Sequence, residues 1–153
     1  MSLIRNYWDV FRSDKLKEKF EEIDNTIYVE EVELTADQII GMNAAPVTVV
    51  AAKGSGKVLE LVGVVAIFDY GTVQFTGGGD VTLAEETSGT SLSAALGVAV
   101  IQAAADSITK VLSIGATLSE NKAIQITNAT APFATGDGVL RLKIAYRVHN
   151  TGL

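Results

Sequence analysis

The segment VLRLKIAYRVH, residues 139–149, decides the fold class of this sequence. Along it an apolar set of side chains alternates with a charged set, namely Leu140, Leu142, Ile144, Tyr146 and Val148 against Arg141, Lys143, Arg147 and His149. Because successive side chains of a β-strand point to opposite faces, this alternation predicts a strand with one buried face and one face in water. Strands of this kind belong to antiparallel sheets that cover a core on one side.

Further strands and turns are expected on the N-terminal side of this segment. The strands are predicted at residues 26–34, 46–52, 57–70, 81–84 and 122–127, with glycine-containing turns at 53–56 and 77–80. Gly63, in the middle of the longest strand, indicates a bulge or a bend. Several short strands with such turns and little helix predict an all-β fold, a jelly-roll-like antiparallel β-sandwich.

Three local features refine this prediction. Residues 26–34 mix β-branched residues with glutamates, a composition typical of an edge strand whose charges discourage aggregation. Thr35 and Gln38 have the spacing of a capping box, which predicts a short helical turn ending near Gly41. The apolar segment 92–105 fits either a buried strand or an alanine-rich helix, and its periodicity does not distinguish the two.

Charge and aromatic content separate the N-terminal part from the rest. Residues 1–33 hold 14 of the 30 charged side chains, and five of the ten aromatic residues lie before residue 29. This shift in composition predicts two parts, a short N-terminal helical arm at residues 1–25 and a β-sandwich domain at residues 26–153.

The arm carries the candidate interface residues. Ser13 is a plausible N-cap, and Asn25 a reasonable stop, for a helix of lysines and glutamates with one apolar stripe. The candidate protein-interface residues are the members of that stripe and three aromatic residues before it, Leu16, Phe20, Ile23, Tyr7, Trp8 and Phe11. Two interpretations stay open: the arm folds back on its own domain, or it docks on a neighbouring subunit. A membrane-surface helix is disfavoured by its acidic polar face.

Composition excludes several classes of function. Cysteine is absent, so the chain has no disulfide framework and no thiolate site. The net charge of −6 argues against a nucleic-acid backbone as partner. The apolar stretch at 92–105 is shorter than the ~20 residues that span a membrane. Asp9 and Arg12 interrupt any apolar run of a signal peptide, so we expect neither membrane nor secretory features.

No motif assembles into a catalytic, cofactor or metal site. Gly54-Ser55-Gly56-Lys57 lacks the upstream glycine and the following Ser or Thr of a phosphate loop, and a hairpin turn is expected there. His149 is the only histidine, on the polar side of its strand, and is expected to be solvated rather than catalytic. Glu85 and Glu86 should face opposite sides. Asp80 with either of them is the remaining candidate for calcium. We therefore expect no enzyme and no cofactor.

Several segments carry a resemblance to a known family. They are LTADQII at 34–40, NAAPVTVV at 43–50, KGSGKV at 53–58, FDYG at 68–71, FTGGGDVTL at 75–83, ITNAT at 126–130, FATGDG at 133–138 and the strand at 140–148. Over roughly residues 34–150 the chain resembles small tailed-bacteriophage virion proteins of the capsid decoration or cement type. The resemblance does not extend to the first 33 residues, and it brings no catalytic residues.

This resemblance implies a jelly-roll-like sandwich that sits as a homotrimer on the capsid surface and clamps neighbouring major capsid subunits. Its implied partners are further copies of itself and the major capsid protein or another virion protein, after assembly in the host cytoplasm. Two other functions stay open. One is a tail- or fibre-associated module that binds a receptor, and the other is a glycan-binding sandwich that uses calcium.

Overall fold

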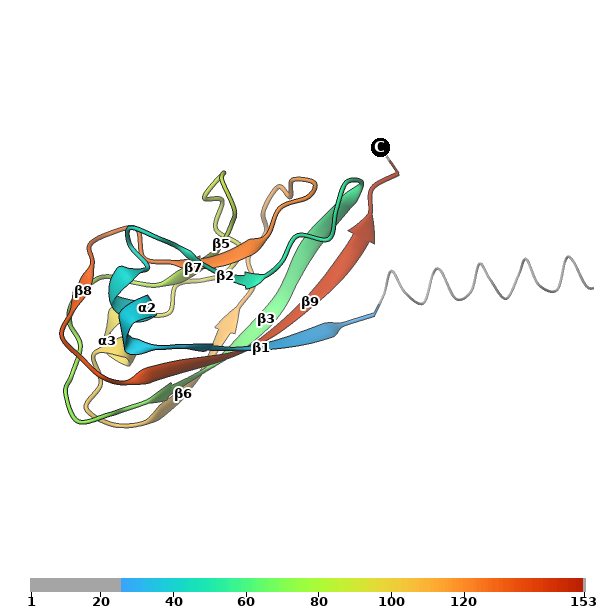
Figure 1. Ribbon diagram of the computed structural model, residues 1–153. Helices are drawn as coiled ribbons and strands as arrows, with labels where there is room; N and C mark the ends of the chain where they lie inside the picture. The colour runs from blue at the N-terminus through green and yellow to red at the C-terminus, as the bar shows by residue number, and fades with distance from the viewer. Residues whose placement is uncertain (1–25, 153) are drawn as a thin grey trace, which may run out of the picture.

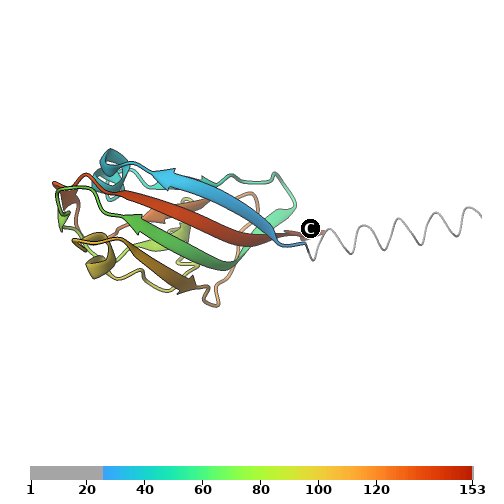
Figure 2. The same cartoon turned by 90° about the horizontal axis from the view of Figure 1, so that it is seen from below.

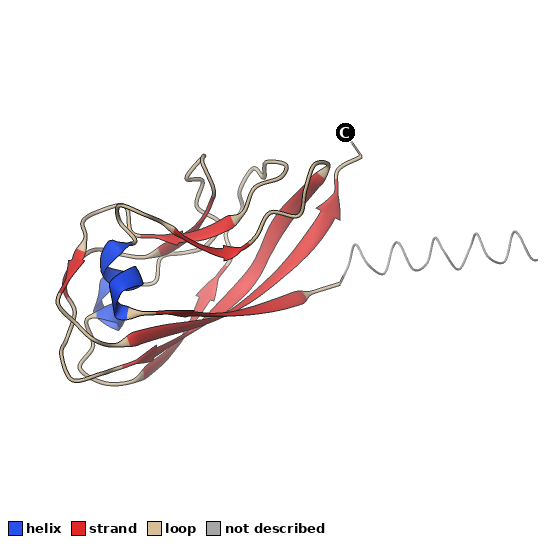
Figure 3. Cartoon of the chain, viewed as in Figure 1, coloured by secondary structure: helices blue, strands red, loops and turns tan. Residues whose placement is uncertain are grey.

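The computed structural model describes residues 26–152, which form two facing antiparallel sheets (Figures 1 and 3). The larger sheet has four strands in the order β1-β9-β3-β6, which Figure 2 shows side by side in blue, red, green and brown. Their bounds are Tyr28–Leu34 for β1, Val139–Asn150 for β9, Lys57–Asp69 for β3 and Ser107–Leu112 for β6. The predicted antiparallel β-sandwich is therefore confirmed.

The smaller sheet covers one face of the larger one. It has three strands in the order β2-β7-β5, with bounds Val47–Val50, Ile124–Thr127 and Thr82–Glu85. One end of the sandwich holds the short helices α2 (Ala36–Gly41) and α3 (Val98–Ile101) together with β8 (Phe133–Ala134), which pairs with β4 (Thr76–Gly77) (Figure 1).

Strand β9 has the alternation that the sequence predicted. Leu140, Leu142, Ile144 and Tyr146 are at most 3% exposed, whereas Arg141 and Lys143 are exposed. On one side β9 pairs with β1, from Tyr28 opposite Tyr146 to Leu34 opposite Leu140. On its other side β9 pairs with β3 along nearly its whole length. Strand β1 is an edge strand, as expected from its glutamates.

The predicted irregularity at Gly63 is a β-bulge. The register between β3 and β9 shifts between Leu61 and Gly63, so that Val62 is the extra residue opposite Ala145. A bulge of this kind bends the strand and increases its twist. Two small residues, Gly63 and Ala145, are opposite each other at this point.

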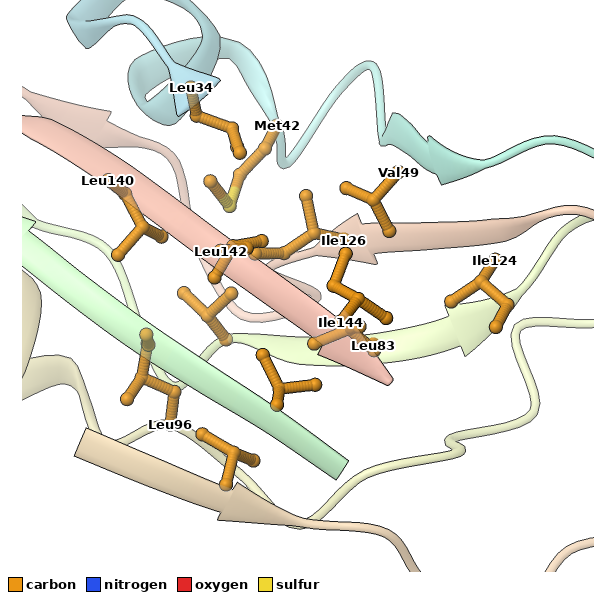
Figure 4. Close-up of a cluster of buried hydrophobic side chains, with 14 of the residues drawn as sticks. Leu34, Met42, Val49, Leu83, Leu96, Ile124, Ile126, Leu140, Leu142 and Ile144 are labelled. Carbon is orange, nitrogen blue, oxygen red and sulfur yellow. The ribbon is translucent and has the colours of Figure 1, made fainter. Parts of the chain in front are cut away.

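The core lies between the two sheets (Figure 4). Ile126 of β7 and Leu83 of β5 face Leu142 and Ile144 of β9, and all four are at most 3% exposed. Burying a side chain of this size contributes about 1.5–3 kcal/mol. Helix α2 closes the core with Ile39, which is fully buried.

The predicted capping box of α2 is present. The Thr35 amide donates to Oε1 of Gln38 at 3.0 Å, and the Gln38 amide donates to Oγ1 of Thr35 at 3.4 Å. These bonds satisfy backbone donors that the first turn leaves without a partner. The helix ends at Gly41, where the sequence placed its end.

The segment after β5 differs from both sequence-based alternatives. Residues 92–105 form neither a continuous strand nor a continuous helix, since α3 is only Val98–Ile101. Isolated bridges instead join Leu96 to Val81 and Ser93 to Ser113. Strand β6 was not predicted, because it buries only Val111 and turns its other large apolar residues outward.

A substitution in the core tests this packing. Ile126→Ala should lower the free energy of unfolding by about 2–5 kcal/mol, because Ile126 is fully buried between the sheets. The matched control Ile27→Ala removes the same atoms from a side chain that is 48% exposed, and should change the value by less than about 0.5 kcal/mol. Urea unfolding measures both. Equal effects would contradict the assigned core.

Candidate functional site

The outer face of the four-stranded sheet is divided lengthwise into a charged half and an apolar half. The charged half lies on β1 and β9. Lys143 Nζ pairs with Glu31 at 3.0 Å, and Arg141 pairs with Asp69 of β3 at 2.8 Å. All four side chains are about half exposed or more, so each pair contributes little to stability. These pairs make most of the β1–β9 half polar and solvated, and Val29 of β1, which is 63% exposed and opposite Ala145, is an apolar position within it.

The apolar half lies on β3 and the edge strand β6, and we name it the β3–β6 patch. Ile67 of β3 is directly opposite Ile108 of β6, and Gly63 is opposite Leu112. The exposed fraction is 75% for Ile108 and 59% for Leu112. The patch consists of Val65, Ile67, Ile108, Leu112 and, just beyond the end of β6, Ile114. Monomeric proteins rarely expose contiguous apolar side chains over such a surface unless they bind something there.

Glu60 lies near the end of the sheet, beyond these two halves, and it is close to two basic side chains. Its Oε2 atom lies 2.6 Å from His149 Nε2 and 3.5 Å from Arg147 Nη1. The hydrogen bond from His149 is the largest cause that holds the pKa of Glu60 below its usual range, and the Arg147 charge adds to it. His149 keeps access to solvent, as expected, with 38% of its side chain exposed, and it is in addition paired with Glu60.

The three carboxylates considered for calcium bind different segments of the chain. Asp80 accepts a hydrogen bond from the Val98 amide at 2.8 Å. Glu85 is 5% exposed and accepts from the Ser119 amide at 2.6 Å and its hydroxyl at 2.7 Å. Glu86 lies beside the Ala123 amide at 3.4 Å. Within residues 26–152, no three His, Cys, Asp or Glu side chains are grouped as metal ligands. These carboxylates hold loops together.

The turn at residues 53–56 is held by two side chains from the loop that precedes β7. The Gly54 amide donates to Asn121 Oδ1 at 3.1 Å, and the Gly56 amide donates to Glu120 Oε2 at 3.3 Å. Amides that would face a phosphate in a phosphate loop are thus occupied by acceptors of the protein. The expected hairpin is wrong, however, because β2 and β3 belong to different sheets and the turn crosses between them.

Asp137 forms a polar site that sequence reasoning did not single out. Its Oδ1 accepts from the amides of Thr72 and Val73, both at 2.8 Å, and its Oδ2 accepts from the Thr72 hydroxyl at 2.6 Å. These bonds, the Thr72 hydroxyl first, hold the pKa of Asp137 below its usual range. A Cβ at Gly71 would overlap this carboxylate. The only signal in the sequence was the Asp-Gly pair typical of turns.

The interface residues predicted from the sequence lie outside the described residues. These are Tyr7, Trp8, Phe11, Leu16, Phe20 and Ile23, in the arm at 1–25. The structure therefore does not describe the position of any of these residues. The candidate interface that it does describe is the β3–β6 patch. No helix in the part that the structure describes is long and apolar enough to cross a membrane.

Comparison with solved structures finds a similar fold in another protein. It is similar to a chain of the cyanophage Pam1 capsid asymmetric unit. The TM-score is 0.50 at 20% sequence identity, and the match covers 80% of this chain and 84% of that chain. At this identity the likeness concerns the fold. No protein-family model matches the sequence, and no curated protein does.

The buried carboxylate of Glu85 should be important for stability. Glu85→Gln keeps the size of the side chain but presents an amide N–H group to donors of Ser88 and Ser119. We expect a loss of about 1–3 kcal/mol in the free energy of unfolding. The control Glu33→Gln changes an exposed glutamate of β1 and should have little effect. Denaturant titration at neutral pH compares them, and an unaffected Glu85→Gln protein would contradict the assigned bonds.

Asp137 should make stability dependent on pH in the acid range. Because folding lowers the pKa of this carboxyl, its contribution is present above the ordinary pKa of about 3.9 and is lost as the pH falls through the lowered value. Asp137→Asn, which cannot ionise, should unfold at lower urea than the parent at neutral pH. The two urea midpoints should approach each other below about pH 4. A gap that is independent of pH would argue against a charge effect.

Proposed function

We propose that this protein is a non-enzymatic structural protein of a tailed-bacteriophage virion, a decoration or cement protein on the capsid surface. The observation that carries the proposal is the likeness of its fold, over 80% of the chain, to a chain of a capsid asymmetric unit. The proposed assembly is a homotrimer that clamps neighbouring major capsid subunits after assembly in the host cytoplasm.

The arrangement of the described residues supports a structural role. The carboxylates Asp80, Glu85 and Asp137 bind loops and strands of the same domain. The β3–β6 patch, in contrast, is an exposed apolar surface on a rigid sheet, and such surfaces suit protein partners. A net charge of −6 disfavours nucleic acid as partner. The proposed partners are copies of this chain and the major capsid protein.

The N-terminal arm is proposed as the part that docks on a neighbour. Its six candidate residues include Trp8 and Tyr7, and Trp and Tyr are enriched among the residues that dominate binding energy at interfaces. The arm joins the sandwich just before the edge strand β1. A segment that leaves from an edge can extend from the domain without disturbing the core.

Deletion of residues 1–25 tests the proposed role. We expect the full chain to be a trimer in size-exclusion chromatography with light scattering, and to co-sediment with capsids of the phage that encodes it. The shortened chain should keep its β circular dichroism and its thermal unfolding, because the core lies within residues 26–152. Its attachment to capsids should weaken by at least about tenfold, because the assembly loses the hot-spot contact that the arm makes with its neighbour.

Reconstruction of the virion by cryo-electron microscopy supplies the location. Density for this chain on the shell would support the proposal, whereas density on the tail or a fibre would replace it with the tail-associated alternative. A monomer that binds capsids equally well without residues 1–25 would contradict both the trimer and the docking arm.

A further inference from the structure

The β3–β6 patch includes the outward face of the strand that ends the larger sheet. The C-terminal end of β6 pairs with residues 92–94, where the Ala94 amide donates to the Leu112 carbonyl at 2.8 Å, and the outward apolar side chains Ile108 and Leu112 are accessible. Proteins normally protect such an edge strand with charges, a bulge or a covering segment, because it otherwise promotes aggregation. Lys110 is the one charged side chain that points outward from β6, between Ile108 and Leu112. One lysine between two exposed apolar residues gives little protection, so we expect a covering segment.

The exposed side chains of the patch lie beside small residues of the neighbouring strands. Ile108 and Leu112 are 75% and 59% exposed, while Gly63 opposite Leu112 and Ala145 opposite Gly63 have little or no side chain.

The 25 residues that precede Thr26 enter the domain at the opposite edge of the same sheet. They lead into β1, whereas the patch lies against β6, with β9 and β3 between them (Figure 2). These residues carry the apolar stripe Leu16, Phe20 and Ile23. The point where these residues join the domain and the patch are thus at opposite edges, an arrangement that allows head-to-tail contacts and closed rings of identical subunits.

From this geometry we infer that residues 14–24 of one copy cover the β3–β6 patch of a second copy. Leu16, Phe20 and Ile23 are the anchors. This inference rests on the proposed function, because it names the surface through which the proposed trimer forms. The occupant is the arm of a neighbouring copy and not the capsid.

The length and the charge of residues 14–24 agree with those of the β3–β6 patch. In a helix, the stripe from Leu16 to Ile23 is about 10 Å long, and Ile108 to Leu112 along β6 is about 13 Å. Residues 14–24 contain five acidic residues and three lysines, so they bring net negative charge to Lys110. Electrostatic complementarity of this kind selects the partner and its register.

Cysteine cross-linking tests the contact directly, because the chain has no cysteine of its own. Full-length Phe20→Cys and Leu112→Cys proteins are prepared separately, mixed and oxidised. We expect a disulfide-linked dimer on a non-reducing gel, with mass spectrometry joining the peptides of positions 20 and 112. Val73→Cys replaces Leu112→Cys as control, since Val73 is similarly exposed (50%) but lies outside the patch.

The outcomes separate the possible occupants. A cross-link between the mixed proteins, absent with Val73→Cys, supports the inference. A cross-link formed only within one chain that carries both substitutions would overturn it in favour of docking in the same chain. No cross-link in either case would overturn it outright.

Charge substitution gives an independent measurement in solution. Ile108→Glu with Leu112→Glu should weaken self-association by at least about tenfold in sedimentation equilibrium, and Val73→Glu should leave it unchanged. Both sites are more than half exposed, so the circular dichroism spectrum should be retained. Combining the double substitution with deletion of 1–25 should add nothing further, because the two changes remove the same contact. Full additivity would overturn the inference.

Failure of this inference and failure of the proposed function give different results. If trimers bind capsids but the mixed proteins do not cross-link, the arm and the patch do not meet and only this inference is overturned. If the cross-link forms but the protein is absent from virions, the contact between copies stands and the proposed function fails.

Discussion

The rest of the structure depends on strand β9, whose side chains alternate between the core and the solvent. Its inward side chains, Leu140, Leu142 and Ile144, pack against the smaller sheet, and its backbone pairs with β1 on one side and β3 on the other. Because the side-chain period of a strand is two, a shift of one residue would place Arg141 and Lys143 in the core. The register of three of the four strands of the larger sheet is therefore tied to one buried apolar row. The bulge at Gly63 is the local adjustment that lets the long strand β3 follow it.

The same constraint produces the outer face. Once the apolar row is directed inward, the charged row must point outward, where Arg141 and Lys143 find acidic partners on β3 and β1. Strand β6 is under no such constraint, since it pairs with β3 at the edge and buries only Val111. The two halves of the outer face thus differ because β9 contributes several side chains to the core, whereas β6 contributes only one. A protein that uses this sheet in an assembly would have its solvated half and its binding half already separated.

Polar groups in the loops serve mainly to hold the ends of the strands in place. Glu85 ties β5 to the loop at Ser119, and Asp137 ties the start of β9 to the loop at Thr72. Charge-assisted hydrogen bonds are stronger than neutral ones, so few are needed to order long connections. This use of carboxylates for structure agrees with a proposed role in which the protein contributes a rigid surface.

The sequence by itself determined the inner row of β9, the edge position of β1, the capping box at Thr35 and the bulge at Gly63. Each of these depends on contacts between near neighbours in the chain or on a strict period, which a sequence displays directly. The tertiary structure alone decided the path of residues 92–105, the existence of β6 and the grouping of Ile67, Ile108 and Leu112 into a patch. Those features depend on which strands meet across a sheet, and partners distant in the chain leave no periodic signal. For the same reason the sequence located a candidate arm, and only the sheet order showed a surface at the opposite edge that it could cover.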